Sequence, residues 1–343
     1  MTRGRSGPLR VGVLGAGAIS QLVHLPLLGA REDVEVVAIT DKDRLKAENI
    51  AERFGIRSVS EDVDVLSDPE LDAVLVCTPN YLHEEHAVTA LEHGKHVLVE
   101  RPLATTSEGA ARILDVARRA GRGVMMNTAH RFRSDTIALY SFIAGGALGE
   151  VFAVRGSLLN RKLAVRSSWR QKTREAGGGA LMDLGVPILD LCLWLIGYPE
   201  IRRVSAVTTS GGGEVEDGAT VLAETATGVS VSAEVSWTLF ADQDRYSAQV
   251  LGRAGSGSLP PLSVFRQLGG RPLSVTPDHP PGRDNPYMTS HRRLLDRFVG
   301  MVTGERAFEL PTEQVRLLEV VEAAYRSARA ETEVGPTDRS PEG

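Results

Sequence analysis

The chain has 343 residues, a length that suits two domains of ordinary size better than a single hydrophobic core. Hydrophobic residues make up 42% of it and charged residues 24%, and it has no uninterrupted apolar run of about 18 residues, which argues against a membrane protein. The formal net charge is -5, and Lys and Arg are scattered along the chain, which argues against a nucleic-acid partner.

The cysteines and the N-terminus indicate the cellular compartment. Cys77 and Cys192 each lie in an apolar run, where we expect a reduced, buried thiol rather than a disulfide or a reactive thiol. The first residues carry positive charge, but the apolar stretch after them is broken by glycine, unlike a signal peptide. We therefore expect a cytoplasmic protein. The histidines show no metal-ligand spacing, so we predict no metal site.

In the first part of the chain, short β-rich runs alternate with helical segments. Continuous apolar strands that alternate with helices are typical of a parallel, doubly wound sheet. We therefore predict an α/β nucleotide-binding domain of the Rossmann type over residues 1–126. The expected strands are residues 10–15, 34–40, 72–80, 95–100 and 123–127, and helices are expected at 45–55 and 106–121.

The pattern changes after His130. Runs of alternating apolar and polar residues indicate a mostly antiparallel sheet with one covered face. We predict an α+β domain over residues 127–334, a flexible tail over 335–343, and turns and loops over the Gly/Pro-rich stretch 252–286. The expected strands are 152–159, 202–210, 219–227, 229–240 and 246–252, and the expected helices are 135–146, 177–197, 291–302 and 311–330.

A glycine-rich turn follows the first strand and opens a helix. Gly15 permits a tight turn, Gly17 lets a pyrophosphate approach the backbone, and the N–H groups of the helix start, from Ala18 and Ile19 onward, can bind it. The next strand ends at Asp41, where a carboxylate would bind the ribose hydroxyls of NAD. An ordinary surface turn residue is the alternative for Asp41. Lys42 could hold the 2′-phosphate of NADP, which stays open, but Asp41 would repel that phosphate and favours NAD.

Two further apolar strands end in polar residues. The first is followed by Cys77-Thr78-Pro79-Asn80, which offers a hydroxyl and an amide to the nicotinamide half of a dinucleotide, with His83 nearby. The second is followed by Glu100-Arg101-Pro102. A plain turn is the alternative for each. We predict that Thr78, Pro79, Asn80, His83, Glu100 and Arg101 contact the cofactor.

With these pieces in order, the chain resembles the glucose-fructose oxidoreductase/inositol dehydrogenase/MocA (Gfo/Idh/MocA) family from roughly Leu9 to Val334. The resemblance is carried by VGVLGAGAISQLVHLP, CTPNYLHEEHA, GKHVLVERPLA, SSWR and GGGALMDLGVPILDLCLWLIG. It implies a nicotinamide-binding Rossmann domain, a second domain whose open sheet makes a homodimer or homotetramer contact, and hydride transfer at a carbon of a sugar, sugar acid or cyclitol.

The sequence departs from the family pattern at two positions. The family typically carries Glu-Lys-Pro where this chain has Glu100-Arg101-Pro102, so Arg101 replaces the lysine. It also carries an aspartate and a histidine four residues apart where this chain has Asp183 and Pro187. Arginine stays protonated, so Arg101 can bind and orient a substrate, preferably an anionic one, but is a poor proton carrier. Asp183 is then the remaining candidate for proton transfer, with a plain helix-start carboxylate as the alternative.

The helix that contains these positions should be irregular. Residues 183, 187 and 190 share one face of a regular helix, so Asp183 and Asp190 should point the same way. Because proline disrupts a helix interior, we predict a kink or a helix start near Gly185 to Pro187.

Further polar residues could bind the substrate. We predict that Asn127, Arg131, Trp169 and Arg170 do so together with Asp183, with domain packing as the alternative. The expected function is an NAD(P)-dependent oxidoreductase with Arg101 and Asp183 as its catalytic residues. The second hypothesis is a family member that binds the cofactor without dehydrogenase activity, as a regulatory or ligand-binding protein or in elimination or epimerisation.

Overall fold

The structure, a computed structural model, describes residues 7–162, 169–278 and 285–338. The chain forms two compact units, the first made of Met1–Asn127 and His291–Thr312 and the second of Thr128–Ser290 and Glu313–Gly343. The segment His291–Thr312 was expected in the second domain, but it packs in the first unit. The reason is the apolar face of its helix, on which Leu294, Leu295 and Phe298 are fully buried.

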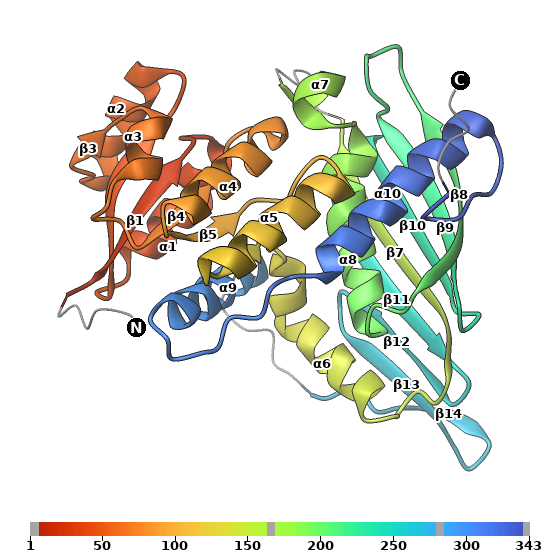
Figure 1. The fold of residues 1–343 in the computed structure, drawn as a ribbon. Coiled ribbons are helices and arrows are strands. Elements are labelled where there is room, and N and C mark those ends of the chain that lie inside the picture. The colour runs from red at the N-terminus through yellow and green to blue at the C-terminus, as the bar shows by residue number, and fades with distance from the viewer. Residues whose placement is uncertain (1–6, 163–168, 279–284, 339–343) are drawn as a thin grey trace. The chain divides into compact units, whose positions relative to one another are not determined.

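The first unit is built on a six-stranded sheet in the order β3-β2-β1-β4-β5-β6, with every neighbouring pair parallel. This confirms the predicted doubly wound fold. The β4 and β5 sequences, AVLV and HVLV, are buried at every position because helices cover both faces of the sheet (Figure 1). The strands are β1 (Leu9–Leu14), β2 (Val34–Thr40), β3 (Ser58–Val59), β4 (Ala73–Val76), β5 (His96–Val99) and β6 (Val124–Met126).

Short polar side chains cap the starts of two helices of this unit. Asp43 accepts the backbone N–H of Lys46 at the start of α2, and Thr106 accepts that of Gly109 at the start of α5, which satisfies groups that the helix itself leaves unpaired. The helices are α1 (Leu25–Gly29), α2 (Arg44–Phe54), α3 (Asp62–Ser67), α4 (His83–Glu92), α5 (Ser107–Ala120) and α9 (Pro286–Val302), with a π-helical turn η1 (Ser20–His24) before α1 and a 3-10 turn η2 (Asn80–Leu82) before α4.

The second unit is built on an eight-stranded sheet in the order β14-β13-β12-β11-β7-β10-β9-β8. All neighbouring pairs are antiparallel except β7 with β10, which confirms the predicted mostly antiparallel sheet. The strands are β7 (Val151–Arg161), β8 (Ile201–Thr209), β9 (Gly218–Thr225), β10 (Ser230–Leu239), β11 (Arg245–Gly252), β12 (Gly255–Leu259), β13 (Ser263–Leu268) and β14 (Arg271–Ser274).

Loops were predicted over residues 252–286, but β12, β13 and β14 lie within 255–274, so the prediction was wrong there; residues 279–284 lie outside the described residues. These strands are short, β12 reads GSGSL, and β14 is exposed at all four positions. A strand at the edge of a sheet does not need a buried face, so it lacks the apolar alternation from which strands are predicted.

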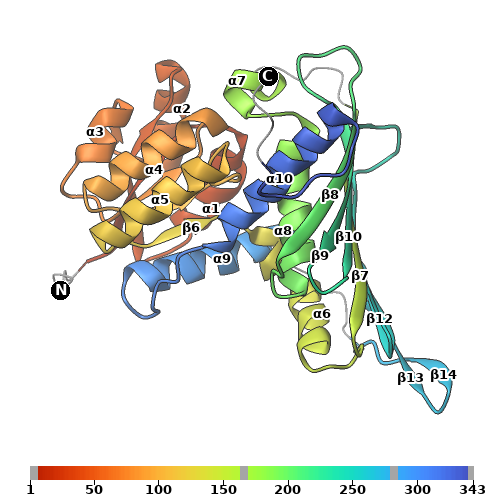
Figure 2. The ribbon, with the colours of Figure 1, turned by 45° about the vertical axis from the view of Figure 1, so that its right-hand side comes forward.

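The helices of the second unit gather on one face of its sheet (Figure 2). Helix α8 packs on β7 and β10, α10 on β8, and α6 on β12. Among the described residues no helix covers the opposite face. The helices are α6 (Ser134–Ala144), α7 (Thr173–Ala176), α8 (Val186–Leu195) and α10 (Glu313–Ala330), with the short turns η3 (Ala129–Phe132), η4 (Trp169–Gln171) and η5 (Leu181–Gly185).

The apolar helix is irregular where the sequence predicts it. A π-helical turn, η5, ends at Gly185, and α8 begins at Val186 with Pro187 in its first turn, where a proline does not lose a helical hydrogen bond. By length and composition Thr173–Leu195 could cross a membrane, but 89% of its most apolar window is buried inside the protein. The helix therefore serves as the core of the second unit.

The expected tail is partly anchored. Arg326 donates to the carbonyl oxygens of Gly335 and Pro336, and Val334 pairs with Val204 beside β8. Residues 339–343 of the expected tail lie outside the described residues.

Candidate active site

The carboxyl ends of β1, β4 and β5 meet at one edge of the first unit's sheet. The order in which successive strands are added to the sheet reverses between β1 and β4, and ligands of doubly wound folds bind at that point. The predicted groups at Gly15, Thr78 and Glu100 directly follow these three neighbouring strands, so they share one edge.

The glycine turn has the shape that a dinucleotide needs. Gly15 has a φ of 96°, and a Cβ there would lie 2.6 Å from the carbonyl oxygen of Cys77, so a side chain would collide with the end of β4. A Cβ on Gly17 would meet nothing within 4 Å, which leaves open space beside the turn. Ser20 closes the turn by donating to the carbonyl oxygen of Gly15 at 2.6 Å.

Asp41 is tied to this turn. Its carboxylate accepts the backbone N–H of Ala16 at 2.9 Å and pairs with Lys46 at 2.7 Å. Burial raises the pKa of Asp41, but Lys46 and the N–H groups of Asp43 and Ala16 outweigh burial, so the net shift is downward and the carboxylate is ionised. Lys42, which was predicted as a possible cofactor contact, is exposed. The cation that forms an ion pair with Asp41 is Lys46.

His83 supports the segment that follows β4. Thr78 and Asn80 are buried at the strand end. His83 is also buried, and its ring nitrogens lie 2.7 Å from the carbonyl oxygen of Pro102 and 2.9 Å from that of Thr78. Burial lowers the pKa of His83, and these carbonyl contacts offset the effect in part. With both nitrogens turned to the backbone, His83 supports the predicted cofactor residues and has no ring nitrogen left for a ligand.

Glu100 lies in a buried hydrogen-bond network. One of its oxygens accepts from Nε2 of His24 and from Nδ2 of Asn127, both at 2.6 Å. Burial raises the pKa of Glu100, but the hydrogen bond and charge of His24 outweigh burial and lower it to about 2. Arg101 follows with intermediate exposure, and the Arg101-Pro102 peptide bond is cis. Asn127 thus supports Glu100, a role that competes with its predicted substrate contact.

The second unit holds its candidates at the start of the apolar helix. Glu216 accepts the N–H groups of Gly179 and Leu181 at 2.9 Å, and Tyr325 donates to it at 2.8 Å. A carboxylate at this end of a helix satisfies unpaired donors and complements the helix dipole. A Cβ on Gly179 would collide with the carbonyl oxygen of Glu216, which explains this member of the glycine triplet.

Asp183 projects from η5 toward an indole and a guanidinium. Its Oδ2 accepts the Nε1–H of Trp237 at 3.1 Å, and its Oδ1 lies 3.8 Å from Nε of Arg170. Arg170 also lies over the ring of Trp169, 4.3 Å from its centroid. The structure therefore gathers three of the predicted residues, Asp183, Arg170 and Trp169, and adds Trp237 to them.

Arg131 and Asp190 form a separate, buried cluster. Arg131 donates from Nε to Asp190 at 2.7 Å and from a terminal nitrogen to Glu313 at 2.9 Å, and Tyr198 and Gln314 also bind Asp190. Burial lowers the pKa of Arg131, but Asp190 outweighs burial, and the net shift is upward. This geometry favours a structural role for Arg131 over the predicted substrate contact.

Asp183 and Asp190 were expected to point the same way, but they bind different partners and belong to separate clusters. Each π turn holds one extra residue, which shifts the phase of a helix by about 100°. Asp183 lies within the turn η5, Asp190 lies in α8, and Pro187 is buried in the first turn of α8.

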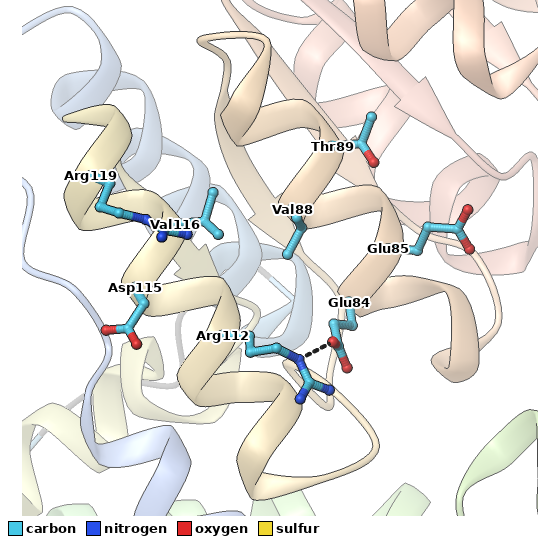
Figure 3. Close-up of a pocket in the computed structure, with 8 residues that line it drawn as sticks. All are labelled: Glu84, Glu85, Val88, Thr89, Arg112, Asp115, Val116 and Arg119. Carbon is cyan, nitrogen blue, oxygen red and sulfur yellow. Dashed lines mark hydrogen bonds and ion pairs between the residues drawn. The ribbon is translucent and has the colours of Figure 1, made fainter.

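Outside these clusters, we find no further catalytic or binding residues among the described residues. In the described residues no group of three or more His, Cys, Asp or Glu has the arrangement of a metal site. The two cysteines are buried, and burial raises the pKa of each thiol, which confirms them as core residues. A groove of about 420 Å³ lies between α4 and α5, where Arg112 pairs with Glu84 at 2.6 Å (Figure 3). None of its lining residues belongs to the predicted cofactor or substrate sets.

The chain was then compared with known proteins. A family model described as "Oxidoreductase family, NAD-binding Rossmann fold" matches residues 9–128, and the "GFO/IDH/MocA C-terminal domain" matches residues 137–258. D-glucoside 3-dehydrogenase of Escherichia coli (strain K12) is 30% identical over 350 residues, 96% of this chain and 98% of that protein. The chain belongs to the Gfo/Idh/MocA oxidoreductase family.

Two more relatives in this family are informative. Glucose-6-phosphate 3-dehydrogenase of Bacillus subtilis (strain 168) is 32% identical over 192 residues, 54% of this chain and 53% of that protein. The crystal structure of GenD2 from gentamicin A biosynthesis in complex with NAD superimposes with a TM-score of 0.83 at 27% identity, covering 97% of this chain and 98% of the other. The expected family, enzyme class and NAD cofactor are confirmed.

The residues of this Gfo/Idh/MocA protein fit the dinucleotide. The open space at Gly17 and the ionised Asp41 at the end of β2 supply the two features that bind a pyrophosphate and a ribose. Sequence reasoning missed Lys46, His24, Glu216 and Trp237. Only Lys46, in the first turn of the helix after Asp41, carried a signal in the sequence. The fold brings each of the other three to predicted residues of its own unit.

Proposed function

We propose that this protein is an NAD-dependent oxidoreductase that acts at a hydroxyl or keto carbon of a sugar, a sugar acid or a cyclitol. The observation that carries the proposal is an intact dinucleotide turn with an ionised Asp41 in a chain that is similar over nearly its whole length to a D-glucoside 3-dehydrogenase. Purified protein with NAD should reduce the cofactor in the presence of at least one member of a panel of glucosides, sugar acids and cyclitols. A flat nicotinamide absorbance across the panel, with NADH binding intact, would overturn it.

Residues of the chain would orient the substrate and transfer its hydroxyl proton. NAD, when bound, would supply the hydride acceptor or donor. Oxidation of an alcohol also requires a group that takes the hydroxyl proton, and neither Arg101 nor Pro187 can do so. Asp183 can, and the N–H of Trp237 fixes one of its oxygens. In this proposal Asp183 relays the proton, Arg101 orients the substrate, and Trp169 and Arg170 contact it.

Arg101 favours a substrate with an anionic group. A guanidinium binds carboxylates and phosphates through two parallel N–H donors, a geometry that lysine does not offer. The similarity to a glucose-6-phosphate 3-dehydrogenase supports an anionic sugar. Uronates and sugar phosphates should therefore have a lower KM than the neutral parent sugars, and Arg101→Lys should reduce that difference.

A second candidate function is cofactor binding without dehydrogenase activity. The observation that favours it is Pro187, buried in the first turn of α8 where the family carries its histidine. The double variant Arg101→Lys, Pro187→His distinguishes the two. Activity that emerges from a silent parent supports this candidate, and an already active parent refutes it.

Self-association through the large sheet is part of the proposal. The face without helices exposes Val207 and Leu222, and a dimer or tetramer formed there would bury them. Sedimentation should give a mass above that of one chain, and Leu222→Lys should lower it. Cytoplasmic location stays a prediction.

A further inference from the structure

Thr78, which the sequence analysis assigns to the cofactor, is held by two histidines one turn apart on α4. His83 contacts its backbone carbonyl oxygen at 2.9 Å, and Nδ1 of His86 lies 3.2 Å from its hydroxyl oxygen. All three residues are buried. The same threonine adjoins the glycine turn, since a Cβ on Gly15 would lie 3.2 Å from the Thr78 nitrogen.

The contact to the hydroxyl is the end of a longer polar chain. On its other side, Nε2 of His86 lies 3.4 Å from a carboxylate oxygen of Asp62, the first residue of α3. The second oxygen of Asp62 accepts the hydroxyl of Thr40 at the end of β2. The series Thr40, Asp62, His86 and Thr78 therefore connects the ends of β2 and β4, the strands on either side of β1.

The charge of the Asp62 carboxylate and the neutral state of the His86 ring determine which atom donates in each of these hydrogen bonds. Burial lowers the pKa of His86, and the nearby carboxylates of Asp62 and Glu85 offset this only in part, so the ring is neutral and has one N–H. An ionised carboxylate can only accept, so the N–H belongs on Nε2, which faces Asp62. Nδ1 must then accept, and the Thr78 hydroxyl donates to it. The remaining lone pairs of that oxygen can accept from a ligand.

We propose that His86 is a positioning residue for the cofactor: supported by Asp62, it turns the Thr78 hydroxyl into an acceptor for a hydroxyl or amide donor of NAD. A phosphate oxygen, which also only accepts, does not suit this hydroxyl. The proposal rests on the cofactor contact of Thr78 within the proposed function. It assigns a role to a histidine that does not itself touch the ligand.

Asparagine and glutamine at position 86 test the two ring nitrogens of His86 separately. Asparagine places its amide oxygen near the position of Nδ1, so His86→Asn keeps an acceptor for Thr78, whereas His86→Gln reaches toward Asp62 instead. In fluorescence titrations of the full-length protein with NADH, His86→Gln and Thr78→Val should each raise the dissociation constant about threefold to tenfold, the effect of one hydrogen bond. His86→Asn and Thr78→Ser should stay within about twofold of the parent.

A double-variant cycle tests whether His86 acts through Thr78. If it does, Thr78→Val with His86→Gln binds NADH no more weakly than Thr78→Val alone. Factors that multiply in the double variant would overturn the proposal, as would equal losses for His86→Asn and His86→Gln. Thermal unfolding without cofactor checks folding, and the Thr78 variants carry the test if a His86 variant does not fold.

Failure of this proposal is distinguishable from failure of the proposed function. An unchanged NADH dissociation constant in Thr78→Val would remove the Thr78 contact, and with it the role of His86. The dehydrogenase proposal would stand as long as the substrate screen shows turnover. Conversely, a silent screen leaves the NADH titrations as a valid test of His86.

Discussion

The indole N–H of Trp237 in β10 donates to a carboxylate oxygen of Asp183 in η5 at 3.1 Å. Trp237 is 4% exposed, so the donor is held in place by packing. If Asp183 relays the proton, Trp237→Phe should lower kcat about tenfold with little change in KM, because it removes one orienting hydrogen bond from the reacting group. Asp183→Asn should lower kcat at least a hundredfold, roughly the contribution of a general base.

Trp237→His is the matched control for that measurement, since it keeps an N–H donor in the same region. Steady-state kinetics on the best substrate from the screen gives kcat and KM separately. Full activity in Trp237→Phe would show that the indole plays no part in orienting Asp183.

Arg131 provides a test between a structural and a substrate-binding role. Because its guanidinium is buried with Asp190 and Glu313, Arg131→Met leaves these carboxylates without their cation. We expect a loss of about 3 to 5 kcal/mol in the free energy of unfolding, measured in urea. A variant that unfolds like the parent but has a raised KM would instead restore the substrate contact predicted from the sequence.

Glu216 should stabilise the helix that carries Asp183. Glu216→Gln keeps the shape of the side chain but removes the charge from the helix N-terminus, and we expect a loss of about 1 to 2 kcal/mol in the free energy of unfolding. Gly179→Ala should be more destabilising, because its Cβ would collide with the Glu216 backbone. Gly213→Ala, where a Cβ would lie 3.6 Å from its nearest neighbour, is the matched control.

His96 should make stability depend on pH. Its Nδ1 accepts the N–H of Gly123 at 2.9 Å, and burial, followed by the charge of Arg122, lowers the pKa of His96 from 6.5 to about 4. The unfolded chain therefore binds a proton that the folded chain rejects between these values. The stabilisation is complete above pH 6.5 and is lost as the pH falls from 6.5 to about 4.

The measurement is urea unfolding at pH 7 and pH 5. His96→Asn offers an amide oxygen to Gly123 and does not titrate, so its free energy of unfolding should fall less on acidification than that of the parent, by roughly 1 to 2 kcal/mol. His83 and His86, whose pKa values are also lowered, keep part of the pH dependence in both proteins. Identical pH dependence in the two proteins would contradict the prediction.

Asp41 and Lys46 should control the choice between the two nicotinamide cofactors. The Asp41 carboxylate repels a 2′-phosphate, so NADH should bind at least about tenfold more tightly than NADPH. Asp41→Ser removes the repulsion and leaves Lys46 without the carboxylate that it contacts at 2.7 Å, so the preference should narrow or reverse. Titrations of both cofactors measure it, and Asp43→Ser is the control at a neighbouring acidic residue.

Local sequence patterns were sufficient for the cofactor turn and for the parallel sheet of the first unit, apart from the two-residue strand β3. The other strands of this sheet are apolar runs, and Gly15, Gly17 and Asp41 lie at the ends of elements, so sequence distance determines where they meet. Arg131 and Asp183 could not be assigned in this way. Arg131 is paired with Asp190 and Glu313, far away in the sequence, and the partner of Asp183 comes from β10.

Long-range packing accounts for the other differences between the predicted and the observed structure. The strands β12 to β14 lack an apolar alternation because they lie toward the edge of a sheet with one open face. The turn η5 breaks the 3.6-residue periodicity that placed Asp183 and Asp190 on one face. The helix α9 shows an ordinary amphipathic pattern, which does not reveal the unit in which it packs.

Because His291–Thr312 belongs to the first unit, that unit cannot complete its fold early in synthesis. The chain leaves this unit after Asn127 and returns to it only at His291. On the ribosome, the nucleotide-binding half is therefore missing a helix until most of the polypeptide has emerged. A fragment that stops at residue 127 would expose the apolar surface that Leu294 and Phe298 cover, so we expect it to aggregate when expressed alone.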